Sequence, residues 1–385
     1  MMNYKTIILG ITGSIGESAL KVLRVNKEEF FLIGFSYHNN FELAKKIQKE
    51  FSVKNISCSN ENITEDEIKY WRSIKCSFYI SMENLLDIDY DMVLISVSGS
   101  SGIKAAYKAA CKGKKMLLAN KESLITAGIP IMAAARDNNT AVIPVDSEHN
   151  SVFRLLNGGK LKSQIDKIIL TASGGPFFNK TFEEIKKASK KDVLNHPTWS
   201  MGSKITVDSA AMVNKALEII EAHYLFNLDY DYLDAVIHPQ SYIHAIVQHI
   251  DGSFFFHVNK PDMVYPLAHS FFYPQPPKKT IEAEVPQQFP DFTFHTIDKE
   301  KFPAFYLGIE SGKRKGSYPA VYNAANEEAV YAFLKEQISF CEIPVIIEKI
   351  IEKNKFTENE NSIDYLLEAD LWARKNAGEI IRSVM

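Results

Sequence analysis

Three polar side chains between residues 214 and 218 have types and spacing that could do chemistry together. Asn214, Lys215 and Glu218 fall within about one turn of a predicted helix, so they can face one point. An amide and an ammonium group suit a phosphate, and a carboxylate suits a hard cation. The competing interpretation is an ordinary amphipathic helix with a polar face.

The residues just before this helix predict a loop that could cover a ligand. Pro197 forces an extended backbone at His196, and Gly202 adds flexibility. Trp199 and Met201 lie on this stretch. The helix is predicted to start with Asp208 or Ser209 as its N-cap, and a hydroxyl there would also suit a phosphate.

Two more carboxylates lie at Asp146 and Glu148. In an extended backbone they point to the same side, where they either repel each other or share a cation. With Glu218 they would supply three oxygen donors. Such a set suits Mg²⁺ or Mn²⁺, with Co²⁺ as a further option, and does not suit structural zinc.

A glycine turn near the N-terminus is the first element that must position a ligand. An apolar run at 6–9 reads as a strand, residues 17–23 read as a helix, and Gly10, Gly13 and Gly16 lie between them. Glycines allow the backbone to approach a pyrophosphate, which binds at the helix N-terminus. A tight turn without a ligand is the alternative.

The predicted second strand, at 31–36, ends without the acid that usually holds the ribose of NAD. No Asp or Glu follows until Glu42. This absence favours NADP, with His38 and Asn39 as candidate neighbours of its 2′-phosphate. Plain turn residues are the alternative.

Further strands at 92–97 and 116–119 alternate with helices, which predicts a parallel doubly wound sheet. Such sheets bind ligands at the C-terminal ends of their strands. The loop at 98–102 could pass under a cofactor. Lys121 stands at a strand end, where it is either a ligand-binding residue or an ordinary surface lysine.

The Ser-Gly-Gly-Pro stretch at 173–176 is either an anion site or a turn. His238 precedes a proline, as His196 does, and is a candidate site residue.

Composition limits the function classes. The 385 residues are 46% hydrophobic and 24% charged, with a net charge of -3. This balance fits two or three globular domains and gives no basic field for nucleic acid or membrane. We expect no signal peptide and no membrane span. Four scattered cysteines fit a cytoplasmic protein without disulfides. Residues 274–290 have linker composition, and residues 302–385 read as helical.

Taken as a set, the motifs resemble one family, the 1-deoxy-D-xylulose 5-phosphate reductoisomerases. They occur in order along nearly the whole chain: GITGSIG at 10–16, LANKES at 118–123, PVDSEHN at 144–150, TASGGPF at 171–177, HPTWSMG at 196–202, VDS at 207–209, NK at 214–215, Glu218, IHPQS at 237–241 and NAANE at 323–327.

The resemblance implies an NADPH-dependent, metal-dependent homodimer acting on a sugar phosphate in isoprenoid biosynthesis. The implied fold is α/β. It comprises a Rossmann-like NADPH-binding domain at 1–145, an α+β catalytic domain at 146–273 with a lid at about 173–203, a linker at 274–300 and a helical domain at 301–385. The reaction converts 1-deoxy-D-xylulose 5-phosphate into 2-C-methyl-D-erythritol 4-phosphate.

The resemblance also assigns roles by motif. The implied metal ligands are Asp146, Glu148 and Glu218. The implied substrate contacts are Lys121, Ser147, Glu148, Ser173, His196, Trp199, Met201, Ser209, Asn214, Lys215 and Glu218. The expected cofactor contacts are Gly10, Thr12, Gly13, Ser14, Ile15, Gly16, Tyr37, His38, Asn39, Ser98, Gly99, Asn120, Lys121, Glu122 and Gly202. The expected catalytic residues are Lys121, Asp146, Glu148, Glu218 and His238.

The chain departs from the family pattern at a few positions. It has Ile11 where many members have Ser, and Ala172 where many have Gly. Where members often read Gly-Lys-Asn, it reads Tyr37-His38-Asn39, which removes a fixed positive charge near the expected 2′-phosphate. Two other functions stay in view: another NADP-dependent dehydrogenase, and a non-catalytic NADP-binding sensor.

Overall fold

The computed structural model describes residues 3–60, 62–158, 162–199, 202–277, 285–356 and 359–384. By its internal contacts the chain forms two compact units, and it passes between them several times. Unit 1 contains Met1–Ser123, Ile131–Asn150 and Asp262–Ala283, and unit 2 contains Leu124–Pro130, Ser151–Pro261 and Glu284–Met385. Over the described residues, no helix is both long and apolar enough to cross a membrane.

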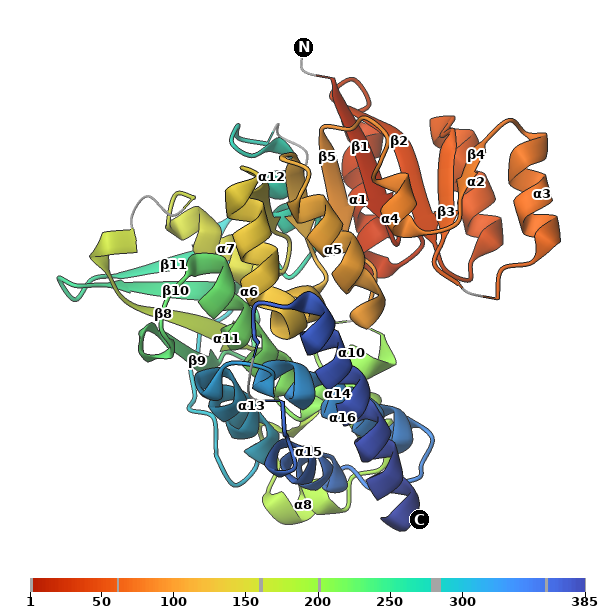
Figure 1. Cartoon of the computed structure of the whole chain (residues 1–385). Helices are drawn as coiled ribbons and strands as arrows, with labels where there is room; N and C mark the ends of the chain where they lie inside the picture. The colour runs from red at the N-terminus through yellow and green to blue at the C-terminus, as the bar shows by residue number, and fades with distance from the viewer. Residues whose placement is uncertain are drawn as a thin grey trace. The chain divides into compact units, whose positions relative to one another are not determined.

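A seven-stranded parallel sheet forms the centre of unit 1, in the order β4-β3-β2-β1-β5-β6-β7. Figure 1 labels β1 to β5 of this sheet. The strands are β1 (Tyr4–Leu9), β2 (Phe30–Tyr37), β3 (Asn55–Cys58), β4 (Ser77–Tyr79), β5 (Met92–Ile95), β6 (Lys115–Leu118) and β7 (Ala141–Pro144). All of β5 and the last four residues of β1 are buried, as expected when helices cover both faces of a parallel sheet.

The helical elements of unit 1 mostly connect successive strands. They are α1 (Ser14–Val25), α2 (Phe41–Phe51), α3 (Glu65–Ser73), α4 (Met82–Leu85), η1 (Ser100–Gly102) and α5 (Ile103–Ala110), joined by the distant α12 (Val264–Phe272). The helix α12 packs against α1, and its Phe271 ring lies 5.2 Å from the ring of Phe30. A segment from late in the sequence therefore completes the core of this unit.

Two helices belong to both units. Helix α6 (Lys121–Asp137) contains Pro130 and is broken at Ala127, where the backbone is not helical. A proline inside a helix lacks its N–H and clashes with the preceding turn, which accounts for the break. Residues 124–130 of α6 belong to unit 2. Helix α7 (Ser147–Leu155) likewise begins in unit 1 and continues into unit 2.

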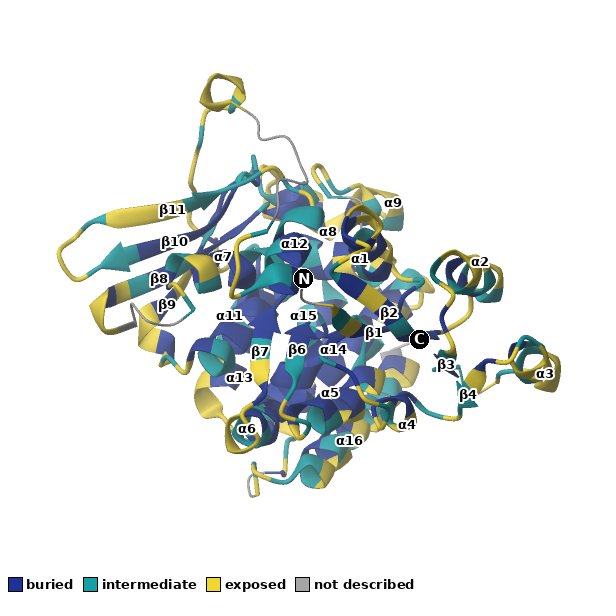
Figure 2. Cartoon of the chain, turned by 90° about the horizontal axis from the view of Figure 1, so that it is seen from above, coloured by how far each residue is buried: buried dark blue, intermediate teal, exposed yellow. Residues whose placement is uncertain are grey.

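Unit 2 carries a four-stranded sheet in the order β11-β10-β8-β9. The strands are β8 (Ile165–Ala172), β9 (Leu233–Ile237), β10 (Ile243–His249) and β11 (Phe254–Val258). Strand β10 pairs antiparallel with β8 and β11, and β8 pairs parallel with β9. The outer strand β11 is largely exposed, as Figure 2 shows.

The helices of unit 2 share one apolar core with this sheet. They are η2 (Lys162–Gln164), η3 (Gly175–Phe177), α8 (Phe182–Lys186), α9 (Lys190–Leu194), α10 (Ser203–Ala210), α11 (Val213–Phe226), η4 (Tyr230–Tyr232), η5 (Pro286–Gln288), α13 (Pro303–Arg314), α14 (Tyr318–Leu334), α15 (Glu342–Glu352) and α16 (Ile363–Val384). Most of α11 and α14 is buried, including several polar side chains such as Glu218 and Glu327 (Figure 2).

The predicted fold class is confirmed: a Rossmann-like parallel sheet, an α+β part and a helical C-terminal part. The division into domains differs from the expected boundaries. Residues from the predicted catalytic and helical domains form one unit because their side chains share one core, including Val213, Ala216, Val321 and Ala324.

Candidate active site

The glycine turn of unit 1 lies at the C-terminal end of β1, where a dinucleotide would bind. Gly10 has φ of +83°, and a Cβ there would lie 2.6 Å from the Ser96 carbonyl oxygen. Its N–H donates to Ser36 Oγ at 2.9 Å. A Cβ on the buried Gly16 would lie 2.3 Å from the Ile11 carbonyl oxygen, so both glycines are required by the turn itself.

The first turn of α1 is open to a ligand. Gly13 is the N-cap and no side chain caps the helix, while Gly13 and Ser14 are exposed. Thr12 and Ile15 are half-buried beside them. Amides of a first helical turn have no intrahelical partner, so this end of α1 is suited to a pyrophosphate.

The end of β2 requires one correction. Tyr37 is fully buried, with its hydroxyl 3.0 Å from Glu67 Oε2 and accepting a hydrogen bond from Trp71 Nε1 at 3.1 Å. Its side chain is a core residue and is not available to a cofactor. His38 and Asn39, by contrast, are exposed. His38 Nδ1 lies 3.1 Å from Ser59 Oγ, and Asn39 Oδ1 accepts from Asn60 Nδ2 at 2.8 Å.

The loops after β5 and β6 are joined through Asn120. Its Nδ2 lies 2.9 Å from the Val97 carbonyl oxygen, 3.0 Å from that of Gly99 and 2.8 Å from Glu122 Oε2. Its Oδ1 accepts from the backbone N–H of Ser123 and so caps α6. Asn120 and Glu122 are buried and support the loop, whereas Ser98 is exposed on it.

Asp146 and Glu148 lie at the C-terminal end of β7, in the same unit. Their backbone is not extended as predicted, because α7 begins at Ser147 and Asp146 accepts from the backbone N–H of Glu148 at 3.2 Å. The two carboxylates still offer oxygens within 4.8 Å of each other. Lys121 Nζ lies 3.6 Å from Asp146 Oδ2, and Ser147 Oγ donates to Glu148 Oε2.

His149 was missed as a site residue. It is fully buried, and its Nδ1 lies 3.2 Å from Asp146 Oδ1. The signal was its position three residues after Asp146 at a helix start, where such side chains meet. Its ring therefore lies beside the Asp146 carboxylate.

In unit 2, the imidazole of His196 lies between two serine hydroxyls. His196 Nε2 is 3.0 Å from Ser173 Oγ and 3.1 Å from Ser209 Oγ. Ser173 follows β8, and Ser209 lies near the end of α10. A Cβ on Gly175 (φ +60°) would lie 2.9 Å from the Ser209 carbonyl oxygen, so the loop after β8 packs directly on α10. Three predicted residues therefore meet at one point.

The other nitrogen of this ring accepts hydrogen bonds from the backbone that follows it. His196 Nδ1 accepts backbone N–H groups from Thr198 at 3.2 Å and Trp199 at 2.9 Å. Burial lowers the pKa of His196, which favours the neutral ring. With Nδ1 accepting, the neutral ring carries its proton on Nε2 and can donate to a phosphate oxygen. The Trp199 ring lies 6.4 Å from that of His244.

The helix start at Asp208 or Ser209 was wrong. Both residues lie inside α10, and α11 begins at Val213 after Met212 adopts a left-handed conformation. Asn214 Nδ2 and Lys215 Nζ both donate to the carboxylate of Glu218, which is 1% exposed. The predicted one-turn grouping on α11 is therefore present.

His238 is a further correction, because it is fully buried. Its Nδ1 lies 3.0 Å from the Thr293 carbonyl oxygen, and its ring is stacked on Phe294. Burial lowers its pKa. Its backbone N–H donates to the Ala172 carbonyl oxygen, so the residue is tied to the end of β8 directly before Ser173. Met201 lies outside the described residues, and Gly202 is exposed.

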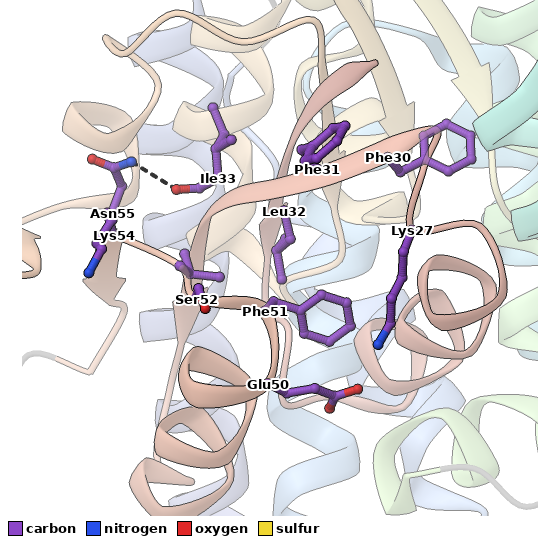
Figure 3. Close-up of a pocket in the computed structure, with 11 residues that line it drawn as sticks. Lys27, Phe30, Phe31, Leu32, Ile33, Glu50, Phe51, Ser52, Lys54 and Asn55 are labelled. Atoms are coloured by element: carbon purple, nitrogen blue, oxygen red, sulfur yellow. Dashed lines mark hydrogen bonds between the residues drawn. The ribbon is translucent and has the colours of Figure 1, made fainter. Parts of the chain in front are cut away.

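A cavity of about 410 Å³ in unit 1 is not the cofactor site. It lies at the start of β2 and β3, between Lys27, Phe31, Phe51 and Asn55, whose side-chain nitrogen donates to the Ile33 carbonyl (Figure 3). Ligands of doubly wound sheets bind at the opposite, C-terminal ends of the strands.

The fold and the site together define the class: a Rossmann-type dinucleotide-binding protein with carboxylates suited to a divalent cation. Family models agree along the chain. The model described as 1-deoxy-D-xylulose 5-phosphate reductoisomerase matches residues 6–128, and its C-terminal domain model matches 142–226. The model described as DXP reductoisomerase C-terminal domain matches 258–376. The chain belongs to the 1-deoxy-D-xylulose 5-phosphate reductoisomerase family.

Individual relatives are similar over almost their whole length. The reductoisomerase of Leptospira interrogans is 42% identical over 383 residues, covering 97% of this chain and 96% of that protein. That of Listeria innocua is 39% identical over 374 residues, covering 95% and 97%.

Solved structures of the family have the same fold. A crystal structure of DOX-P reductoisomerase in complex with NADPH, fosmidomycin and magnesium superposes with a TM-score of 0.92 at 31% identity, covering 100% of this chain and 99% of that one. The Zymomonas mobilis enzyme in complex with NADPH gives 0.92 at 32% identity, covering 99% and 100%.

Proposed function

We propose that this protein converts 1-deoxy-D-xylulose 5-phosphate into 2-C-methyl-D-erythritol 4-phosphate, using NADPH and a divalent cation, in the methylerythritol phosphate route to isoprenoids. The observation that carries the proposal is similarity over the entire chain to a reductoisomerase crystallised with NADPH, fosmidomycin and magnesium. The two-serine and histidine cluster of unit 2 supplies the anion site that a sugar phosphate needs.

NADPH binds at the C-terminal edge of the parallel sheet in this proposal. The positive φ of Gly10 and the open first turn of α1 fit a pyrophosphate that approaches the backbone closely. His38 and Asn39 are exposed at the end of β2, where the adenosine ribose of such cofactors lies. When bound, NADPH supplies the hydride that reduces the rearranged aldehyde.

The residues that would hold the metal in this proposal are the three carboxylates Asp146, Glu148 and Glu218. An all-carboxylate set fits a hard cation such as Mg²⁺ or Mn²⁺, with Co²⁺ as a further option. When bound, the cation polarises the substrate carbonyl. His149 lies beside Asp146, and the hydrogen bonds from Asn214 and Lys215 fix the orientation of Glu218.

The chain's own groups bind and orient the substrate. The Nε2–H of His196 and the hydroxyls of Ser173 and Ser209 donate to the phosphate, with Asn214 and Lys215 as further donors. Lys121 and Ser147 contact the carbon chain, where Lys121 beside Asp146 can hold or move a proton. The phosphate is remote from the reacting bonds, so its binding energy can position the lid through Trp199.

The same proposal includes a cytoplasmic homodimer. Strand β11 forms one edge of its sheet among the described strands, and Phe254, Phe255 and Phe256 on it are each about half exposed. Such an apolar edge suits pairing with a second copy of the same strand. The four cysteines are free, which fits a reducing compartment. Light scattering of wild type and of Phe255→Lys, with a monomeric variant expected, tests the interface.

NADPH consumption with 1-deoxy-D-xylulose 5-phosphate tests the reaction. We expect consumption with Mg²⁺ or Mn²⁺ and none after chelation. Consumption that survives chelation would favour another dehydrogenase. NADPH binding with no turnover under any metal would favour a non-catalytic sensor.

A further inference from the structure

A buried chain of polar side chains links α10 to the C-terminal helices α14 and α16, all within unit 2. Helix α10 contributes a lysine and an aspartate, α14 an asparagine and a glutamate, and α16 an aspartate and an arginine. They are Lys204, Asp208, Asn326, Glu327, Asp370 and Arg374.

The contacts run without a break from one helix to the next. Asn326 Nδ2 donates to Asp208 Oδ1 at 2.8 Å, and Lys204 Nζ lies 2.9 Å from Asp208 Oδ2. Glu327 lies between two cations: Lys204 Nζ at 3.6 Å and Arg374 Nη1 at 2.7 Å.

The arginine is fixed in turn by α16. Arg374 donates two hydrogen bonds, at 2.7 and 3.0 Å, to the carboxylate of Asp370, four residues earlier on the same helix. This paired geometry holds the plane of the guanidinium group. Glu327 is therefore anchored to α16 on one side and faces α10 on the other.

The burial of these charges indicates that the network fixes how the helices are placed relative to one another. Asp208 is 1% exposed, Glu327 4% and Asp370 2%. Removing charges from water costs roughly what their mutual attraction returns, and apolar side chains of similar volume often give equal or higher stability. What such a network does provide is a defined direction and distance between the elements it joins.

The element that the network holds carries the anion site. Ser209 directly follows Asp208, and its hydroxyl lies 3.1 Å from His196 Nε2. Lys204 lies two residues after Gly202, where the lid segment rejoins the fold. The close approach of Gly175 to Ser209 couples any shift of α10 to the Ser173 loop.

We propose that Asn326, Glu327 and Arg374 are positioning residues for the phosphate site, acting through α10. This inference rests on the proposed function. It gives the C-terminal helices a part in substrate recognition, since they set where Ser209 stands relative to His196 and Ser173.

The test compares Glu327→Gln with Glu328→Gln. The substitution at 327 keeps the shape but removes the charge between Lys204 and Arg374. Glu328 is the next residue on α14, lies 3.6 Å from Arg374 and is not part of the chain of contacts to α10. The readouts are the inhibition constant of inorganic phosphate against the sugar phosphate, KM, kcat, and the Kd of NADPH.

We expect Glu327→Gln to raise the phosphate inhibition constant and KM by about tenfold, since small displacements of positioned groups cost rates and affinities of this order. Expected changes in kcat and in NADPH Kd are smaller than about threefold. Glu328→Gln should resemble wild type. A Glu327→Gln protein that melts at lower temperature yet binds phosphate like wild type would overturn the proposal.

Asn326→Ser gives a second test if Glu327→Gln does not fold at the assay temperature. It removes the hydrogen bond to Asp208 and keeps every charge, and the same rise in KM is expected. Unchanged phosphate binding in folded Asn326→Ser would overturn the proposal equally. Ser209→Ala tests the proposed function separately from the positioning role. If this variant leaves phosphate inhibition unchanged, the assignment of the phosphate site is wrong, whatever the variants at 326 and 327 do.

Discussion

The Nδ1 atom of His196 accepts the backbone N–H of Trp199 at 2.9 Å, so one imidazole ring holds the backbone within the stretch predicted as a lid. Its Nε2 atom simultaneously lies beside the hydroxyls of Ser173 and Ser209. In the proposed function, phosphate recognition and lid anchoring depend on the two opposite nitrogens of this one side chain.

Substitutions at His196 can separate these two roles. The amide oxygen of His196→Asn can replace Nδ1 as acceptor, and the amide nitrogen of His196→Gln can replace Nε2 as donor. We expect His196→Asn mainly to weaken phosphate binding, raising KM by about tenfold or more. We expect His196→Gln mainly to lower kcat, because the lid loses its anchor. Steady-state kinetics measure both, and identical profiles for the two variants would contradict the division of roles.

A substitution at Gly13 can test cofactor binding separately from folding. A Cβ there meets only the Gly10 carbonyl oxygen at 3.4 Å, and its φ of -85° suits any residue. We expect Gly13→Ala to leave stability within about 0.5 kcal/mol and to raise the NADPH Kd about tenfold, since the added methyl faces the ligand. Titration of NADPH and thermal melting check this.

Gly16→Ala is the matched contrast. Its methyl group would lie 2.3 Å from the Ile11 carbonyl oxygen, so the turn itself must shift and stability should fall by about 1–3 kcal/mol. Equal stability of the two variants would show that the close approach is relieved without cost.

We propose that the residues at the end of β2 set the preference for NADPH over NADH. His38 is exposed there, and residues 37–40 include no lysine. We expect His38→Lys to raise the ratio of kcat/KM for NADPH to that for NADH about fivefold, because an ammonium group attracts the 2′-phosphate that NADH lacks. Equal changes for both cofactors would place the 2′-phosphate elsewhere.

Loss of one carboxylate should act on turnover and spare the cofactor. We expect Glu218→Gln to lower kcat about 100-fold or more, because a neutral amide is a poor ligand for a divalent cation. The Kd of NADPH should stay within about twofold. Glu221→Gln, a buried glutamate one turn later on α11, is the control. Parallel losses of turnover and NADPH affinity in Glu218→Gln would argue against a metal role.

The lowered pKa of His196 predicts a pH dependence of stability. Because burial lowers this pKa in the folded protein, the unfolded chain binds the proton more tightly. The stabilisation is present above the ordinary value of 6.5 and is lost as pH falls below it. Denaturant unfolding at a series of pH values should show a steeper acid decline for wild type than for His196→Asn.

The lowered pKa values of His223 and His238 do not affect this comparison. Burial lowers their pKa values too, but both residues are present in wild type and in His196→Asn. Their contributions therefore cancel in the difference. Superimposable pH profiles would mean that His196 does not titrate differently in the folded and unfolded states.

The features that depend on local residue types and spacing were predicted from the sequence. Apolar runs marked β1 and β5, and the polar groups of α11 met as their spacing requires. Prediction failed where tertiary packing decides. Tyr37 lies next to polar residues that are typical of a turn, yet it ends β2 and its ring packs in the core beside Trp71. The left-handed Met212 that separates α10 from α11 has no sequence signal, because non-glycine residues rarely adopt that conformation.

The same limit applies to contacts between distant segments. Nothing in the order of residues shows that Glu327 and Arg374 reach α10, since the pairing depends on how three helices pack. Likewise, the motif around His238 suggested a site residue, whereas Phe292 and Phe294 enclose its ring.

The interleaving of the chain between the two units has a consequence for how the protein is made. Helix α12, which packs on α1 and brings Phe271 against Phe30, is synthesised long after the sheet it completes. At translation rates of roughly 5–20 residues per second, the early strands wait on the order of ten seconds or more for this partner. During that interval the nascent sheet presents apolar surface to the solvent, so the polypeptide is expected to depend on a ribosome-associated chaperone. No single cut in the gene would release either unit as an independent folding module.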